Sequence, residues 1–185
     1  MEGTKSLDVF KLFEENKKVI AAVAIILFFV LSKPTKASIF FGVVFCIAGL
    51  AVRAVSFVNE EGEGADSLTT SGIYSYVRNP KEVGAFIVGS GVFIMGNTCI
   101  LKILLIIALI VIYKEKIKVK EEKLKERFKE KFEDYAFNVP SVLPRLTPWE
   151  KGSKISFDRG LFLAQKEYWG WLIIYLITIV MFLKS

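Results

Sequence analysis

Long apolar runs separated by short polar segments dominate this chain. The five clearest runs are Val19–Ser32, Ser38–Val58, Pro80–Met95, Cys99–Tyr113 and Leu172–Leu183. About 20 apolar residues in a helix cross the hydrocarbon layer of a bilayer, and shorter runs can be extended by their flanking residues. The pattern therefore predicts an all-α fold, a polytopic transmembrane helical bundle with about five spans.

Short turn signals divide the runs into hairpins. Lys33–Lys36 contains a proline and separates the first two runs, and Gly96–Thr98 separates the third from the fourth. Pro80 suits the first turn of a helix. The fourth run continues without glycine or proline into Lys114–Phe128, which is rich in good helix formers. One helix from about Cys99 to Phe128 would be roughly 45 Å long and would extend into water on the cytoplasmic side.

Two segments and one residue admit two interpretations each. Ser6–Lys18 has an apolar face that favours an amphipathic helix at the membrane interface, and a fraying polar tail is the alternative. Asn59–Ser71 contains four carboxylates and two glycines, which predicts a mobile solvated loop in preference to a calcium site. Arg53 lies near the end of its span, where it can reach the headgroups or serve in binding.

Composition supports a single integral membrane domain over residues 1–185. The chain is 53% hydrophobic, and its net charge of +6 comes from basic residues next to apolar runs. This arrangement favours lipid headgroups as partners and argues against nucleic acid. Histidine is absent, which removes the commonest metal ligand and any imidazole-based triad. The two cysteines have no CxxC spacing, so no metal site is predicted.

The distribution of lysine and arginine predicts the orientation of the chain. Thirteen of these residues lie in Lys114–Arg159, whereas the opposite side carries only Lys33, Lys36, Lys102 and Lys184. Positive loops stay in the cytoplasm. We therefore expect a multi-pass protein with a cytoplasmic N-terminus, an external C-terminus and both polar clusters on the cytoplasmic face.

The first polar cluster is the turn-rich stretch Thr70–Gly84. Within nine residues it offers aromatic faces, donors, acceptors and a fixed positive charge, on Tyr74, Tyr76, Arg78, Asn79 and Glu82. A connector needs none of these groups. The second cluster, Glu121–Glu122, follows the fourth run at the same face. We interpret the two as halves of one cofactor site.

Two separated motifs carry a family resemblance. The chain reads Gly72-x-Tyr74-x-x-x-Arg78-Asn79-Pro80-x-x-x-Gly84, then a hydrophobic hairpin, then Glu121-Glu122-x-Leu124-x-x-x-Phe128, Tyr135 and Val139-Pro140-x-x-x-Pro144. This order resembles the isoprenylcysteine carboxyl methyltransferase and phospholipid methyltransferase families of membrane enzymes. The similar core covers about residues 70–145. The departures are Asn79 at a usual histidine, Glu82 at a usual tyrosine and Lys129 at a usual glycine.

The resemblance implies an enzyme that uses S-adenosylmethionine (SAM) to methylate a membrane-embedded, lipophilic acceptor. It implies Arg78 and Glu121 as catalytic residues, and a cofactor site made by Tyr74, Tyr76, Arg78, Asn79, Pro80, Glu82, Glu121 and Glu122. Methyl transfer from a sulfonium needs alignment more than acid–base catalysis, so a chain without histidine can perform it. Arginine can pair with the cofactor carboxylate, and a glutamate can hold its amino group or ribose.

Other interpretations of the same residues stay open at this point. Arg78 could bind a lipid phosphate, the tyrosines could be ordinary interfacial aromatics, and Glu121–Glu122 could belong to a solvated helix face. Glu82 and Lys129 motivate a family-derived protein that binds a nucleotide-like ligand or a partner without catalysis. A transporter or channel has little support, because no span carries an acidic residue at mid-depth.

Overall fold

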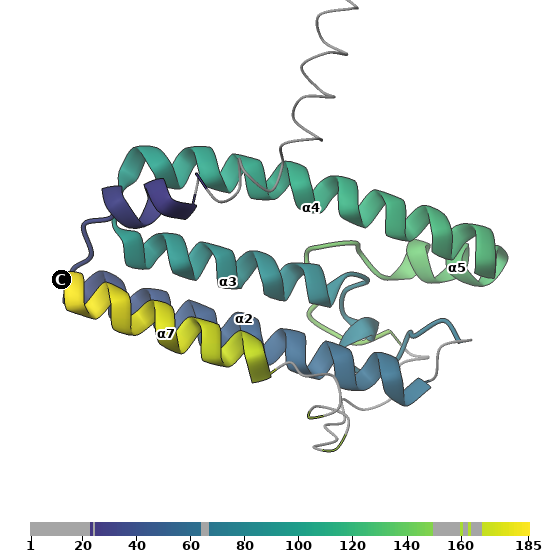
Figure 1. Ribbon diagram of the computed structural model, residues 1–185. Helices are drawn as coiled ribbons and strands as arrows, with labels where there is room; N and C mark the ends of the chain where they lie inside the picture. The colour runs from purple at the N-terminus through teal and green to yellow at the C-terminus, as the bar shows by residue number, and fades with distance from the viewer. Residues whose placement is uncertain (1–22, 24, 64–66, 150–159, 161–162, 164–167) are drawn as a thin grey trace, which may run out of the picture.

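The computed structural model describes residues 23, 25–63, 67–149, 160, 163 and 168–185. All regular structure in this part of the chain is helical, which confirms the all-α class. The elements are α2 (Lys36–Glu63), the 3₁₀-helix η1 (Gly72–Ser75), α3 (Pro80–Gly96), α4 (Cys99–Phe128), α5 (Glu130–Asn138) and α7 (Tyr168–Lys184). In Figure 1, α3 lies between α4 and α2, α7 runs beside α2, and α5 folds back under the far end of α4.

The second hairpin forms as the sequence predicts. Helix α3 begins at Pro80 and ends at Gly96, and Asn97 makes the turn in the left-handed region with φ 49°. Helix α4 then runs unbroken for 30 residues, which confirms that the fourth apolar run and Lys114–Phe128 are one helix. This continuity carries Glu121 to the end of α3 at which Arg78 lies.

Helices α2 and α3 touch through their backbones. A Cβ added to Gly49 would lie 2.6 Å from the carbonyl oxygen of Gly84, and one added to Gly84 would lie 2.7 Å from that of Gly49. Small residues permit this close approach of two helices. The apolar core of the bundle packs around the same pair, with Cys46 and Leu50 of α2, Met95 of α3 and Met181 of α7 buried.

The expectation of a mobile loop over Asn59–Ser71 is wrong for its first part. Helix α2 continues to Glu63, so Asn59 is helical and 4% exposed. Its Oδ1 accepts a hydrogen bond from the backbone N–H of Ile73, at 3.1 Å. The side chain that accepts this hydrogen bond from η1 therefore belongs to α2. The acidic composition of Asn59–Ser71 gave no sign that the helix extends so far.

Helix α5 was not anticipated from the sequence. It begins directly after Lys129, whose φ of 45° and ψ of −120° break the helix axis between α4 and α5. Lys129 stands where the resembled families usually have glycine, and glycine adopts such a conformation without strain. In this chain Lys129 adopts the conformation although it carries a side chain. Phe132, Tyr135 and Val139 form a small second core beneath it.

Membrane spans are supported only in part. Within the described residues, Lys36–Glu60 is the one helix long and apolar enough to span a bilayer by length and composition, and α7 is apolar but shorter. Ser6–Lys18 and residues 19–22 and 24 of the first apolar run lie outside the described residues, whereas residues 25–31 are helical. The count of five spans and the orientation stay predictions.

Candidate functional site

Glu121 meets the polar stretch before α3. One of its carboxylate oxygens accepts a hydrogen bond from Arg78 Nη2 at 3.1 Å, and the other accepts one from Asn79 Nδ2 at 2.6 Å. Ser141 Oγ donates to the same second oxygen at 2.8 Å. Arg78, Asn79, Glu121 and Ser141 are hereafter the polar network. It joins three segments that are far apart in the sequence.

Arg78 is more deeply integrated than the sequence suggested. Its side chain is 13% exposed, and Nη1 donates to the carbonyl of Ala136 at 2.7 Å. The guanidinium also lies 5.8 Å from the ring centre of Phe132. These contacts hold α5 against the start of α3. Its Nε is buried without a hydrogen-bond partner among the described residues.

The connection after α5 folds back over the polar stretch. The backbone N–H of Arg78 donates to Pro140 O at 2.9 Å, and that of Arg145 donates to Tyr76 O at 2.9 Å. Val139 itself is extended, with φ −119° and ψ 123°. The chain bends over Ser141–Leu143 as it returns. This return explains how Ser141 reaches Asn79 and Glu121.

Tyr74 and Tyr76 differ in environment. Tyr74 is 4% exposed, and its hydroxyl donates to Glu60 Oε2 at 3.2 Å. Burial, together with the nearby Glu60 carboxylate, raises the pKa of the Tyr74 phenol well above its ordinary value. Its backbone carbonyl accepts from Tyr135 at 2.7 Å. Tyr76 is half-buried and contributes its own carbonyl to the returning chain.

Asn79 and Pro80 are both buried at the start of α3. Asn79 Nδ2 reaches Ser141 as well as Glu121, whereas its Oδ1 is buried without a hydrogen-bond partner among the described residues. An amide thus takes the donor role at a position where the resembled families usually carry histidine. Pro80 occupies the first helical position, where its missing N–H costs nothing.

The structure separates Glu82 and Glu122 from the polar network. Glu82 is 5% exposed, and its carboxylate lies 3.7 Å from Lys116 Nζ and 3.5 Å from Lys120 Nζ. One of its oxygens has no hydrogen-bond partner within the described chain. Glu122 is exposed on the outer face of α4, one residue from Glu121. Of the two neighbouring glutamates, only Glu121 turns toward Arg78.

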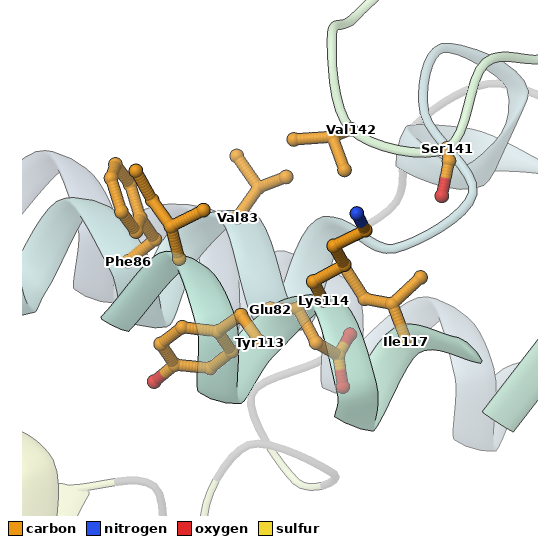
Figure 2. Close-up of a pocket in the computed structure, with 9 residues that line it drawn as sticks. Glu82, Val83, Phe86, Tyr113, Lys114, Ile117, Ser141 and Val142 are labelled. Carbon is orange, nitrogen blue, oxygen red and sulfur yellow. The ribbon is translucent and has the colours of Figure 1, made fainter. Parts of the chain in front are cut away.

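A largely apolar cavity of about 350 Å³ lies between α3 and α4, and we call it the apolar pocket. Figure 2 shows its side chains converging from the two helices and from the returning connection. The walls are almost entirely hydrocarbon, with the Glu82 carboxylate beneath them. The lining residues are Glu82, Val83, Phe86, Ile110, Tyr113, Lys114, Ile117, Ser141 and Val142.

A second cavity, of about 290 Å³, follows the next turns of α4, and we call it the polar pocket. Charged, hydroxyl and aromatic groups share its walls with a few leucines. The lining residues are Glu60, Ser67, Leu68, Thr69, Tyr74, Arg78, Lys120, Leu124, Arg127, Phe128 and Tyr135. The polar network spans the two cavities, because Arg78 lines the polar pocket and Ser141 lines the apolar one.

Sequence reasoning missed several lining groups. Ser141 carries no signal beyond its place between two prolines. Lys120 and Arg127 belong to a run of charges in which nothing marks the inward positions. Glu60 was assigned to the acidic loop. Two lining residues are predictable from a continuous helix through Glu121. Leu124 and Phe128 lie three and seven residues after Glu121, and therefore on the same face of the helix.

The sequence model of the phospholipid methyltransferase family matches residues 37–131. No curated protein and no solved structure matches the chain. The matched segment includes α2, the polar stretch, α3 and α4, and thus contains both helices that line the apolar pocket. It also contains Arg78, Asn79 and Glu121 of the polar network. The chain belongs to the phospholipid methyltransferase family, a family of membrane-associated methyltransferases that act on lipid-like substrates.

Proposed function

We propose that this protein transfers a methyl group from SAM, bound in the polar pocket, to a lipophilic acceptor bound in the apolar pocket. The observation that carries this assignment is the adjacency of two cavities of opposite character along one helix, α4, with the polar network between them. A charged donor and a hydrocarbon-rich acceptor need two such environments next to each other.

The polar pocket matches the charges of the cofactor. Arg78, Lys120 and Arg127 supply positive charge for its carboxylate, and Glu60 supplies negative charge for its ammonium group. Aromatic side chains in the same wall can stack on adenine or face the sulfonium. The unpartnered Nε leaves Arg78 a donor for the cofactor, while Glu121 fixes the guanidinium through Nη2.

The chemistry requires alignment and exclusion of water. The nucleophilic atom of the acceptor attacks the methyl carbon in line with the departing sulfur, which takes the electron pair of the broken bond. No histidine is needed for this step. The returning segment Pro140–Arg145 covers the polar stretch through backbone hydrogen bonds, so it can shield the reacting groups from water. Cytoplasmic placement of the site remains part of the proposal.

A second candidate is a ligand-binding protein without catalysis. It is favoured by Glu82, which places a buried carboxylate in the apolar pocket where the resembled families usually have tyrosine. In this case the protein would bind a nucleotide-like ligand or a partner, and methyl transfer would not follow. A methyl-transfer assay with radiolabelled SAM, using phospholipid vesicles and isoprenylcysteine analogues as acceptors, separates the two candidates.

The binding part of the proposal is tested by calorimetric titration of the purified protein with SAM. Arg78→Ala should weaken SAM binding about ten- to a hundred-fold, because each charge-assisted hydrogen bond contributes roughly 1.5–3 kcal/mol. Arg145→Ala is the matched control, since its guanidinium also donates to a backbone carbonyl, Asn138 O at 2.6 Å, but lines neither pocket. Equal affinities for both variants would remove Arg78 from the site. Absence of SAM binding to the wild type would overturn the proposal.

A further inference from the structure

Three apolar side chains project outward from the connection after α5. Val142 is 46% exposed, Leu143 79% and Leu146 100%. We call these three residues the leucine patch. The backbone beside them is fixed, because Asn79 N–H donates to Ser141 O and Arg145 N–H donates to Tyr76 O. The patch is therefore held in place on a hydrogen-bonded frame.

The apolar pocket gives the depth of this patch relative to a membrane. Val142 lines that pocket together with Ile110, Tyr113 and Lys114 of α4. The sequence of α4 changes from apolar to highly charged between Tyr113 and Lys114. Such a change marks the level at which a membrane helix leaves the hydrocarbon for the headgroups. Val142 lies at this level, and Leu143 follows it directly in the chain.

The charges around the patch fit a phospholipid surface. Lys114, Lys116 and Lys118 are exposed on the turns of α4 that follow the boundary. Lysines at this position can extend toward lipid phosphates while their methylene stems cover apolar surface. Exposed leucines next to such a basic belt are the pattern of segments that lie in the interfacial layer.

We propose that the leucine patch docks into the headgroup–acyl boundary of a phospholipid leaflet and forms the lipid-facing rim of the apolar pocket. The use of this rim as the access route for the acceptor rests on the proposed function. The docking itself does not, because it follows from exposure, depth and charge alone.

Phe137 provides a control within the same region. It is 90% exposed and apolar, yet it lies on α5 beside the acidic residues Glu133 and Asp134. It lines neither pocket, and acidic neighbours disfavour contact with phosphate headgroups. We expect this side chain to stay in water. Exposure alone therefore does not decide membrane contact.

The test places one cysteine at position 137, 143 or 146 in the full chain carrying Cys46→Ala and Cys99→Ala, in nanodiscs of zwitterionic and anionic phospholipids. Each cysteine is labelled with an environment-sensitive fluorophore and quenched with lipids that carry a nitroxide near the headgroup. Labels at 143 and 146 should be quenched at least threefold more strongly than the label at 137. If the cysteine replacements fail to fold, Leu143→Trp and Phe137→Trp in a chain carrying Trp149→Phe, Trp169→Phe and Trp171→Phe, with brominated lipids, give the same comparison.

Equal quenching at all three positions, whether strong or absent, would overturn the proposal, because it would show no preferential insertion of the patch. SAM titration on the same preparations keeps the two ideas apart. Preferential quenching without SAM binding would retain the docking surface and reject the proposed function. SAM binding with no preferential quenching would retain the proposed function and reject the docking surface.

Discussion

Helix α3 meets two of its neighbours, α2 and α4, in opposite ways. Against α2 it packs backbone to backbone, because Gly49 and Gly84 leave no room for even one added carbon. Against α4 it leaves a cavity of about 350 Å³, with Phe86 on one wall and Ile117 on the other. The same helix thus has a closed face and an open face.

The open face is held by polar contacts at one end. Glu82 lies within ion-pair distance of two lysines of α4, and Asn79 donates to Glu121. Rigid elements that support a site preserve its geometry, whereas a site itself must admit ligands. The α2–α3 pair therefore serves as a scaffold, whereas α4 is positioned by side chains that also line the pockets.

The largest expected effect comes from adding a side chain where the backbones of α2 and α3 touch. Gly84→Val should destabilise the protein by about 3 kcal/mol or more, because the new side chain meets the Gly49 carbonyl and neither backbone can move cheaply. Thermal unfolding in detergent measures this change. Gly170→Ala is the control: its added carbon meets only the flexible end of Leu50, at 3.1 Å, so its stability should change by less than about 1 kcal/mol. Equal behaviour of the two variants would contradict the contrast between the faces.

The second effect tests the open face. Glu121→Ala should weaken SAM binding about ten- to a hundred-fold, because it leaves Arg78 and Asn79 without their shared acceptor. Glu122→Ala alters an exposed carboxylate on the outer side of the helix and should leave SAM affinity within about twofold of the wild type. Calorimetric titration compares the two. A larger loss from the Glu122 variant would reverse the assignment of these neighbours.

The helices were predictable because their causes are local. Apolar runs, Pro80 and the absence of helix breakers through Lys114–Phe128 suffice for α3 and α4. The extension of α2 past Asn59 was not predictable in this way. Asn59 accepts a hydrogen bond from η1, and sequence patterns do not indicate such a tertiary contact. Helix α5 was missed because Lys129, a good helix former, adopts a conformation with positive φ.

Within the site, the proximity of Arg78, Asn79 and Glu121 was predictable from the two motifs and the hairpin between them, whereas the contact of Glu121 with Ser141 was not. Ser141 reaches the polar network because the chain after α5 folds back over the polar stretch. This fold-back depends on tertiary hydrogen bonds. The separation of Glu82 from the network could not be foreseen from spacing either. It lies three residues after Asn79 on the first turn of α3, and only the packing of α4 determines that its carboxylate faces Lys120 instead.

A smaller effect concerns Tyr74, which joins the scaffold to the polar pocket. Tyr74→Phe removes its bond to Glu60 and should cost about 1 kcal/mol of stability near neutral pH. Because the folded chain raises the pKa of this phenol, its contribution is fully present below about pH 10 and is lost as pH rises further. Thermal unfolding from pH 7 to 11 should therefore show a weaker alkaline decline in the variant. Identical profiles for the wild type and Tyr74→Phe would contradict this role.

The smallest expected effect separates the two pockets through the two partners of one ion pair. Glu82 lines the apolar pocket and Lys120 lines the polar pocket, with their charged atoms 3.5 Å apart. If SAM occupies the polar pocket, Glu82→Gln should change its Kd by about twofold or less, equivalent to roughly 0.4 kcal/mol. Lys120→Gln should weaken binding several-fold, because it removes a positive charge from the cofactor pocket. Loss of the ion pair itself would affect both variants alike, so only an asymmetric result assigns SAM to one side. A tenfold loss from Glu82→Gln with no loss from Lys120→Gln would place the cofactor in the apolar pocket and reverse the proposed roles of the two cavities.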